Sequence, residues 1–296
     1  MAPSTQNTGP EAPQLFVGRR RQLVGSRYAR VASIISTTAV LAVLAVVLWM
    51  APGGKAVREF FLSPSHAWRA FFGDPMQGLS AIWRGFLTNI WMFIVCEILV
   101  LLFGLLIAVV RMSQSPILTP FRILSTVYTD LFRGIPVILV LFAVGYGIPG
   151  MDLGWISTQS PAVYACIALT ITYSAYVAEV YRAGINSVAT SQLVAARAIG
   201  LRQGTTMRYV VLPQAVRNVV PPLLNDFISL QKDTALVSTL GIVDATQAAH
   251  IYGSSNFNFA GYTVASLLFL LLTIPMTRLT DRLIDRDRTK RLAHIS

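Results

Sequence analysis

Ionisable and amide side chains that interrupt long apolar runs are the residues of this sequence best suited to chemistry. A charge inside an apolar segment is costly, so such a residue is expected to face protein, water or a ligand rather than lipid. The candidates for a pathway or for an interface between membrane subunits are therefore Glu97, Glu179, Asn225, Asp226, Ser229, Lys232 and Asp233.

The spacing of these side chains leaves two interpretations open. Glu179 and Arg182 are three residues apart, so in a helix they can pair, which favours a structural role near the cytoplasmic boundary over substrate contact. Asn225, Ser229 and Lys232 share one helical face, and Asp226 and Asp233 share a neighbouring one. These faces would line either a pathway or a hydrogen-bonded subunit interface.

Glu97 has the same two interpretations. It is either a pathway residue or a carboxyl group held within an interface.

The sequence shows no residue pattern for catalysis, nucleotide binding, metal binding or a disulfide framework. No nucleophile and base are paired in the sequence, and no G-x-x-x-x-G-K-[ST] loop is present, so ATP would have to bind a separate chain. His66, His250 and His294 are far apart, and Cys96 and Cys166 fall inside apolar runs. The sequence thus predicts no metal centre and no disulfide framework.

The composition predicts a membrane protein. Hydrophobic residues make up 54% of the 296 residues, the mean hydropathy is +0.59, and 12% are charged, against about 25% in soluble domains. The formal net charge of +11 comes from basic residues that flank apolar runs. Membrane topology explains that pattern better than nucleic-acid binding.

Six segments are long and apolar enough to be predicted as transmembrane spans. The fifth is polar along one side and cannot face lipid all round. The spans are 33–51, 83–110, 131–149, 161–182, 218–243 and 260–280. Residues 1–32 are predicted to be a disordered basic segment, and 282–296 a basic tail.

The distribution of Lys and Arg sets the predicted orientation. Basic residues follow the second, fourth and sixth spans, whereas residues 150–160 and 244–259 contain none. Loop 52–82 is the exception, with Lys55, Arg58 and Arg69. Because Lys and Arg are retained in the cytoplasm, both termini and residues 190–213 are predicted to be cytoplasmic.

The segment 190–213 is predicted to form two short helices with a tight corner. Ser191 is placed to cap a helix that runs to Ile199, and Gly200 suits the left-handed position that ends it. A second helix is expected to begin at Gly204-Thr205, with Pro213 restarting the chain into the fifth span. Such a compact element suggests a docking site, although an ordinary interfacial loop would have a similar pattern.

Several motifs in order resemble permeases of bacterial ABC importers for polar amino acids of the histidine, glutamine and glutamate type. The resemblance covers about residues 79–291. The motifs are V-A-A-R-A-I-G at 194–200 with V-V-L-P at 210–213, L-F-R-G-I-P at 131–136, Y-S-A-Y-V-A-E-V-Y-R-A-G-I at 173–185 and P-P-L-L-N-D-F-I-S-L-Q-K-D-T-A-L at 221–236. The sequence departs from the family pattern at Val194, where Glu is usual, at Ala189, where Pro is frequent, and at Asp226, where Glu is common.

This resemblance implies an all-α polytopic protein of the bacterial inner membrane. A five-helix permease core at 79–281 would contain the cytoplasmic coupling loop 190–213, and the segment 33–51 would be one extra N-terminal transmembrane helix. In the family this loop seats in the ATPase subunit. Its contact residues would be Leu193, Ala195, Ala196, Arg197, Ile199, Gly200, Leu201 and Arg202, with Leu193, Ala196, Ile199 and Leu201 filling an apolar pocket.

The resemblance also implies a function and partners. The chain would form the translocation pathway for a polar amino acid, with glutamate, glutamine or aspartate as the preferred guess. It would bind no cofactor itself, because ATP and Mg²⁺ would bind a cytosolic ATPase dimer. A second permease chain, identical or not, an extracytoplasmic amino-acid-binding protein and membrane lipid would complete the assembly. The alternatives are a transporter driven by an ion gradient, for which no internal repeat is evident, and a membrane enzyme or scaffold.

Overall fold

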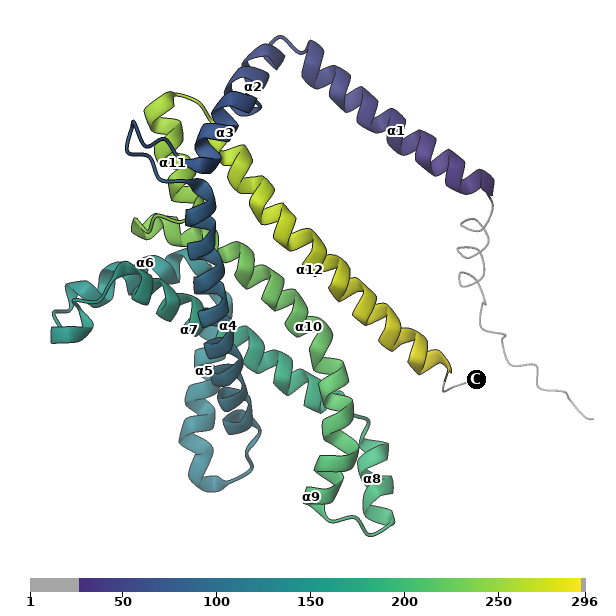
Figure 1. The fold of residues 1–296 in the computed structure, drawn as a ribbon. Coiled ribbons are helices and arrows are strands. Elements are labelled where there is room, and N and C mark those ends of the chain that lie inside the picture. The colour runs from purple at the N-terminus through teal and green to yellow at the C-terminus, as the bar shows by residue number, and fades with distance from the viewer. Residues whose placement is uncertain (1–26, 294–296) are drawn as a thin grey trace, which may run out of the picture. The chain divides into compact units, whose positions relative to one another are not determined.

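A computed structural model describes residues 27–293, and this part of the chain is helical apart from turns and one isolated antiparallel bridge between Asp74 and Leu79 (Figure 1). The residues outside it include the basic cluster at 19–21 and most of the segment predicted to be disordered. The chain divides into two compact units between Arg58 and Glu59. The first contains α1 (Arg27–Met50) and most of α2 (Gly54–Phe61).

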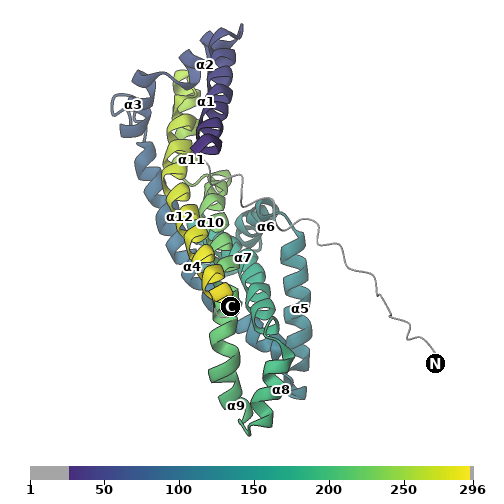
Figure 2. The same cartoon turned by 90° about the vertical axis from the view of Figure 1, so that its right-hand side faces the viewer.

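The second unit contains the other helices. They are α3 (Pro64–Phe72), α4 (Ile82–Met112), α5 (Thr119–Gly134), α6 (Val137–Gly150), α7 (Pro161–Asn186), α8 (Thr190–Ala198), α9 (Gln203–Thr206), α10 (Leu212–Asp233), α11 (Ala245–Asn256) and α12 (Ala260–Ala293). Helices α8 and α9 lie at one end of this unit, and α3 lies at the other (Figure 2).

Several helices have the length and apolarity that a bilayer requires. In the described part of the chain, α4, α7 and residues 260–285 of α12 qualify alone, and α5 with α6 qualifies as a bent pair. The three single helices agree with the predicted second, fourth and sixth spans, and α6 overlaps most of the predicted third. The helix α1 matches the predicted first span, and its apolar part, Val31–Val47, is shorter.

The predicted third span, 131–149, is wrong as a single helix. Its first four residues end α5, and α6 leaves at an angle of 110°. The bend falls at Ile135 and Pro136, where proline disfavours a helical conformation for the residue before it. Arg133, within the predicted span, lies in the last turn of α5.

The predicted fifth span, 218–243, is also corrected. The helix α10 stops at Asp233, and residues Thr234–Leu240 form a tighter 3-10 helix. The hydroxyls of Thr234, Ser238 and Thr239 each donate to the carbonyl three residues earlier. Such local bonds compete with the α-helical pattern, and the three-residue step suits the tighter helix.

The main hydrophobic core lies between α4, α6, α7 and α10. It is built on fully buried side chains such as Met92, Cys96, Leu141, Leu169 and Leu230. Small residues let the two central helices approach closely, as is usual between transmembrane helices. A Cβ atom added to Gly104 of α4 would lie 2.6 Å from the Val177 side chain of α7.

A second core joins α3, α4, α11 and the start of α12. Asp244, which has no exposed surface, caps α11 by accepting from the Gln247 amide at 2.8 Å. Asn89 of α4 donates to the same carboxylate at 2.9 Å. Burial raises the pKa of Asp244 above its usual range, with the Asn89 hydrogen bond acting in the opposite direction.

Candidate functional site

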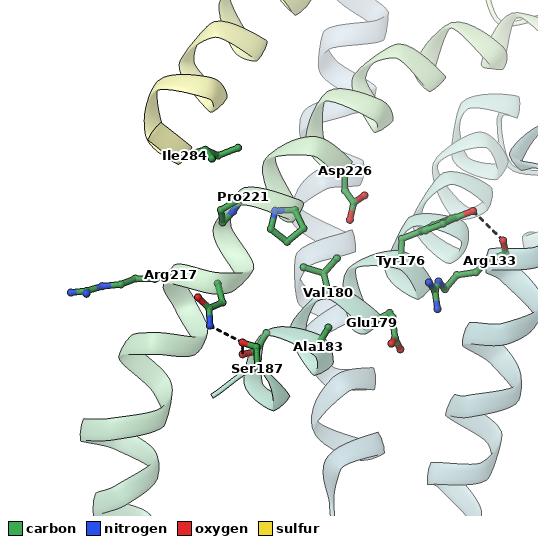
Figure 3. A pocket seen from close by; sticks show the side chains of 13 residues that line it. Arg133, Tyr176, Glu179, Val180, Ala183, Ser187, Arg217, Pro221, Asp226 and Ile284 are labelled. Carbon is green, nitrogen blue, oxygen red and sulfur yellow. Dashed lines mark hydrogen bonds between the residues drawn. The ribbon is translucent and has the colours of Figure 1, made fainter. Parts of the chain in front are cut away.

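A cavity of about 740 Å³ lies between the C-terminal half of α7 and residues 217–226 of α10 (Figure 3). The end of α5 and Ile284 of α12 complete its wall. Its lining includes four charged residues, Arg133, Glu179, Arg217 and Asp226, together with Tyr176, Ser187 and Asn218. The cavity therefore combines both signs of charge in a largely apolar part of the protein.

Two opposite charges face each other across this cavity. Asp226 points inward from α10, and its buried Oδ2 atom has no hydrogen-bond partner among the described residues. Arg133 comes from the end of α5 and is near enough to interact electrostatically with Asp226. The Arg133 guanidinium lies 6.0 Å from the centre of the Tyr176 ring, and the Tyr176 hydroxyl donates to the Arg133 carbonyl at 3.2 Å. Asp226 thus offers an acceptor, and Arg133 a donor, to a small polar molecule.

Glu179 has a different role in the same wall. It accepts from Arg182 Nε at 3.0 Å and from Arg111 Nη1 of α4 at 3.0 Å. The expected pairing with Arg182 is therefore confirmed, and Arg111 is a second partner. With two guanidinium groups bound, Glu179 ties α7 to α4 near the ends where α8 and α9 lie.

The polar face predicted on α10 is open. Asn225 and Lys232 are exposed and Ser229 is half-buried, whereas Asp233 accepts a hydrogen bond from the Tyr173 hydroxyl at 2.7 Å. Glu97 of α4 is half-buried, interacts electrostatically with Asp226 and does not line the cavity. The structure thus brings Asp226 and Glu179 to one cavity and leaves Asn225, Ser229 and Lys232 on an outer face.

The corner after α8 has the predicted geometry. Gly200 has a φ of +80°, and its amide donates to the Arg197 carbonyl at 2.9 Å. The Leu201 amide donates to the Ala196 carbonyl at 3.1 Å. This pair of bonds is the Schellman motif, which satisfies carbonyls that the helix end would otherwise leave unpaired.

The other expectations for this segment need correction. The helix α8 begins at Thr190 after Ala189, so Ser191 is not its cap. The chain does not restart at Pro213, because α9 continues through a π-helical turn at Met207–Val211 directly into α10. Pro213 has no amide to donate, and it comes just after the π-helical turn, where the Leu212 amide already bonds five residues back to the Met207 carbonyl.

The apolar residues of α8 divide between two sides. Leu193 is half-buried against the Val188, Val211 and Ala215 cluster, Ala196 is buried, and Leu201 is half-buried. Val194 and Ile199 are exposed by 60% and 78%. Ala195, Arg197, Gly200 and Arg202 are exposed as well.

Polar contacts connect α8 and the end of α7 to α10. Gln214 of α10 bonds to Gln192 of α8, and Asn218 donates to the Ser187 hydroxyl at 2.6 Å. Asn218 and Ser187 also line the cavity. The polar contacts that join α7, α8 and α10 therefore connect the corner at Gly200 to the cavity.

Some site residues could not be found from spacing. Arg111 lies 68 residues before Glu179, and Tyr176, Ser187 and Arg217 show no pattern of their own. The signal for Arg111 was its position at the basic end of an apolar run, which also fits a boundary residue.

Comparison with known proteins covers most of the chain. Residues 101–289 match the family model for the binding-protein-dependent transport system inner membrane component. The arginine transport system permease protein ArtQ of Bacillus subtilis is 32% identical over 70% of this chain and 92% of its own length. The probable glutamine ABC transporter permease protein GlnM of the same species is 35% identical over 59% of this chain and 78% of its own length. A solved amino acid ABC transporter with histidines aligns with a TM-score of 0.64 and 30% identity over 69% of this chain and 93% of that one.

Proposed function

Because this chain belongs to the inner membrane components of binding-protein-dependent transport systems, as a permease subunit of ABC importers for polar amino acids, we propose that the Arg133–Asp226 cavity lies on its translocation pathway. The family places the chain in the inner membrane as a multi-pass protein that is not itself an ATPase. A transporter driven by an ion gradient, the alternative left open by the sequence, is not supported by this membership.

The single observation that carries the proposal is the unpartnered Asp226 oxygen opposite Arg133. An amino acid in water is a zwitterion, with an ammonium group that suits a carboxylate and a carboxylate that suits a guanidinium. Glu179 adds a second carboxylate, already paired, to the same wall. Because Asp226 is the carboxylate of this lining that is not bound by guanidinium groups, a neutral or cationic substrate side chain is favoured beside it over glutamate and aspartate, whose extra negative charge it would repel.

The substrate we propose is therefore of the glutamine, arginine and histidine group. The printed names of related proteins mention glutamine, arginine and histidines. Glutamine was among the sequence-based guesses, and the two acidic amino acids in that set become less favoured.

The corner at α8 is proposed to couple the pathway to a cytosolic ATPase dimer, on which ATP and Mg²⁺ would bind. Its outward face combines Val194 and Ile199 with Arg197 and Arg202. Exposed apolar side chains with a basic rim suit a pocket bordered by acidic groups. Displacement of α8 would move α10, and with it Asp226, because packing and hydrogen bonds join the two helices.

The exposed face with Asn225, Ser229 and Lys232 is proposed to meet a second permease chain across the pathway. Polar side chains at membrane depth require protein or water in place of lipid. Both termini are proposed to lie in the cytoplasm, with α1 as an additional transmembrane helix. A reporter that is active only in the cytoplasm, fused ahead of residue 19, tests this topology, and activity of an exported reporter there would overturn it.

Reconstitution tests the function. The permease, its ATPase and its binding protein are placed in vesicles, and ATP-dependent uptake of radiolabelled glutamine, arginine, histidine and glutamate is measured. We expect uptake of at least one of the first three, and a loss of at least about tenfold in Asp226→Asn, which corresponds to 1.4 kcal/mol. Asp152→Asn, the same change at an exposed residue in the turn after α6, provides the control. Unchanged uptake in Asp226→Asn would refute the cavity assignment.

A further inference from the structure

Two strongly exposed apolar side chains lie in neighbouring segments at the end of the second unit opposite α8 and α9. Met76 is 99% exposed and Phe257 is 81% exposed. They belong to the turn at residues 74–79 and to the segment 254–258 at the end of α11, which we call the apical tip. The side chain of Gln77 reaches Asn256 at 3.5 Å, so the residues next to Met76 and Phe257 are in contact.

The backbone at Phe257 is unusual for a bulky residue. Its φ of +49° and ψ of +36° lie in the left-handed region, where glycine or asparagine is the usual residue. This conformation costs roughly 1–2 kcal/mol in a residue with a Cβ atom. The side chain gains little from burial in return, because most of its surface is exposed. Such strain is typical of positions where the side chain serves a contact outside the fold.

The apical tip is held firmly by the packed structure beneath it. Asp74 and Leu79 form a bridge that closes the first turn, and the Met76 amide donates to the Asp74 carboxylate at 3.1 Å. Tyr252, which is buried in α11 five residues before Phe257, is hydrogen-bonded to His66 of α3 at 2.9 Å. The two exposed side chains are therefore presented by an ordered surface, which lowers the entropic cost of binding a partner.

The composition of the apical tip favours a soluble protein over lipid as the partner. Segments that rest on membranes combine aromatic residues with Lys or Arg that attract anionic headgroups. Residues 73–81 and 253–263 contain no Lys or Arg, and their charged residue is Asp74. Gln77, Ser254 and Ser255 are exposed around Met76 and Phe257. Apolar anchors within an uncharged polar rim are typical of protein interfaces.

We propose that Met76 and Phe257 are the anchors by which this permease binds its soluble amino-acid-binding protein. This inference rests on the proposed function, including the topology that makes the apical tip extracytoplasmic. The family model describes transport systems that depend on a binding protein. The apical tip is an exposed apolar surface at the end of the second unit opposite α8 and α9, where such a protein would bind.

Photocrosslinking in intact cells tests the contact. The photoreactive amino acid p-benzoylphenylalanine replaces Phe257 in the full-length permease, and illuminated adducts are identified by mass spectrometry. We expect an adduct with a soluble solute-binding protein. The matched control carries the same amino acid at Met151, which is 66% exposed in the turn after α6. Adducts with lipid only, no protein adduct, or equal yields at the two positions would overturn the proposal.

A substitution measures how much the anchor contributes. Phe257→Asn keeps a residue that tolerates left-handed backbone, so the fold should be preserved. With the binding protein identified from the adduct, we expect its half-saturating concentration for ATPase stimulation to rise at least tenfold, while the rate at saturation changes less than twofold. Met76→Ser should shift it in the same direction, and Met151→Asn should not. An unchanged half-saturating concentration in both variants at the apical tip would contradict the inference.

The two levels of the proposal fail in different ways. If wild-type vesicles show no ATP-dependent amino acid uptake, the proposed function is wrong. If uptake is present and Phe257 gives no protein adduct, only the assignment of the apical tip is wrong.

Discussion

The helices α8 and α11 end in the same backbone conformation with different residues. The helix α8 ends at Gly200, with a φ of +80° and open space around the position of a Cβ atom. The helix α11 ends at Phe257, with a φ of +49° and a largely exposed ring. Both ends expose apolar side chains beyond the fold, at opposite ends of the second unit.

The difference indicates whether the backbone turn or the side chain is the important feature at each helix end. At α8 the corner itself matters, because it turns the chain between two helices, and the exposed apolar groups come from Val194 and Ile199 nearby. Glycine gives that corner without strain. At α11 the left-handed residue carries the apolar group, so the side chain is kept although the backbone would favour glycine.

The largest effect is expected where α11 begins. Asp244→Ala removes the cap and leaves buried Asn89 without one acceptor, so we expect a loss of about 2–4 kcal/mol in the free energy of unfolding. Thermal unfolding in detergent measures it. Asp244→Asn keeps a capping oxygen and should lose clearly less. An equal loss in both variants would show that the cap contributes nothing at this end.

The next effect concerns the corner after α8. Gly200→Val should introduce strain on the order of 1–2 kcal/mol and separate ATP hydrolysis from uptake, with the protein still in the membrane. Uptake by reconstituted vesicles, compared with their ATPase rate, measures the coupling. Gly204→Val is the control, because Gly204 also has open space but no positive φ. Normal coupling in Gly200→Val would contradict the role of the corner.

A smaller effect is expected at the end of α11, where the substitution should stabilise the protein instead of destabilising it. Phe257→Gly relieves roughly 1–2 kcal/mol of left-handed strain, and the freedom of glycine in the unfolded chain takes back about 0.4–1 kcal/mol. The protein should therefore unfold at a slightly higher temperature, whereas Gly200→Ala should lower the temperature. If both variants shifted in the same direction, the contrast between the two ends would be lost.

The smallest effect is expected between the two ends, at Glu97. This residue does not line the cavity, and an amide keeps the hydrogen-bonding capacity of the carboxyl group. Glu97→Gln should therefore change uptake kinetics by less than about twofold, or roughly 0.4 kcal/mol. Loss of uptake with assembly intact would assign Glu97 to the pathway.

Local patterns predicted those features that depend on neighbours in sequence. The Gly200 corner and the Glu179–Arg182 pair follow from spacings of a few residues, and both are present. The apolar runs likewise located the long helices. Family resemblance identified the permease, because its motifs occur in order along most of the chain.

Features that depend on distant contacts were not predictable in this way. The Arg111–Glu179 bond joins residues 68 positions apart. A helical pattern also does not tell which apolar side faces the protein's own core: Leu193 packs against the Val188, Val211 and Ala215 cluster, and Ala196 is buried. The 110° bend at Pro136 depends on how α6 packs against α7, which a proline alone does not specify.

The π-helical turn at Met207–Val211 absorbs one extra residue between α9 and α10. The Leu212 amide bonds five residues back to the Met207 carbonyl, so this turn closes with one residue more than an α turn. Deleting a single residue here would therefore give an ordinary α turn and leave the phase of α9 relative to Asp226 nearly unchanged. The same deletion in the α-helical part of α10 before Asp226 would instead rotate everything before it by about 100°. Related permeases that are one residue shorter at this turn would keep the same cytoplasmic corner aligned with the same face of the pathway.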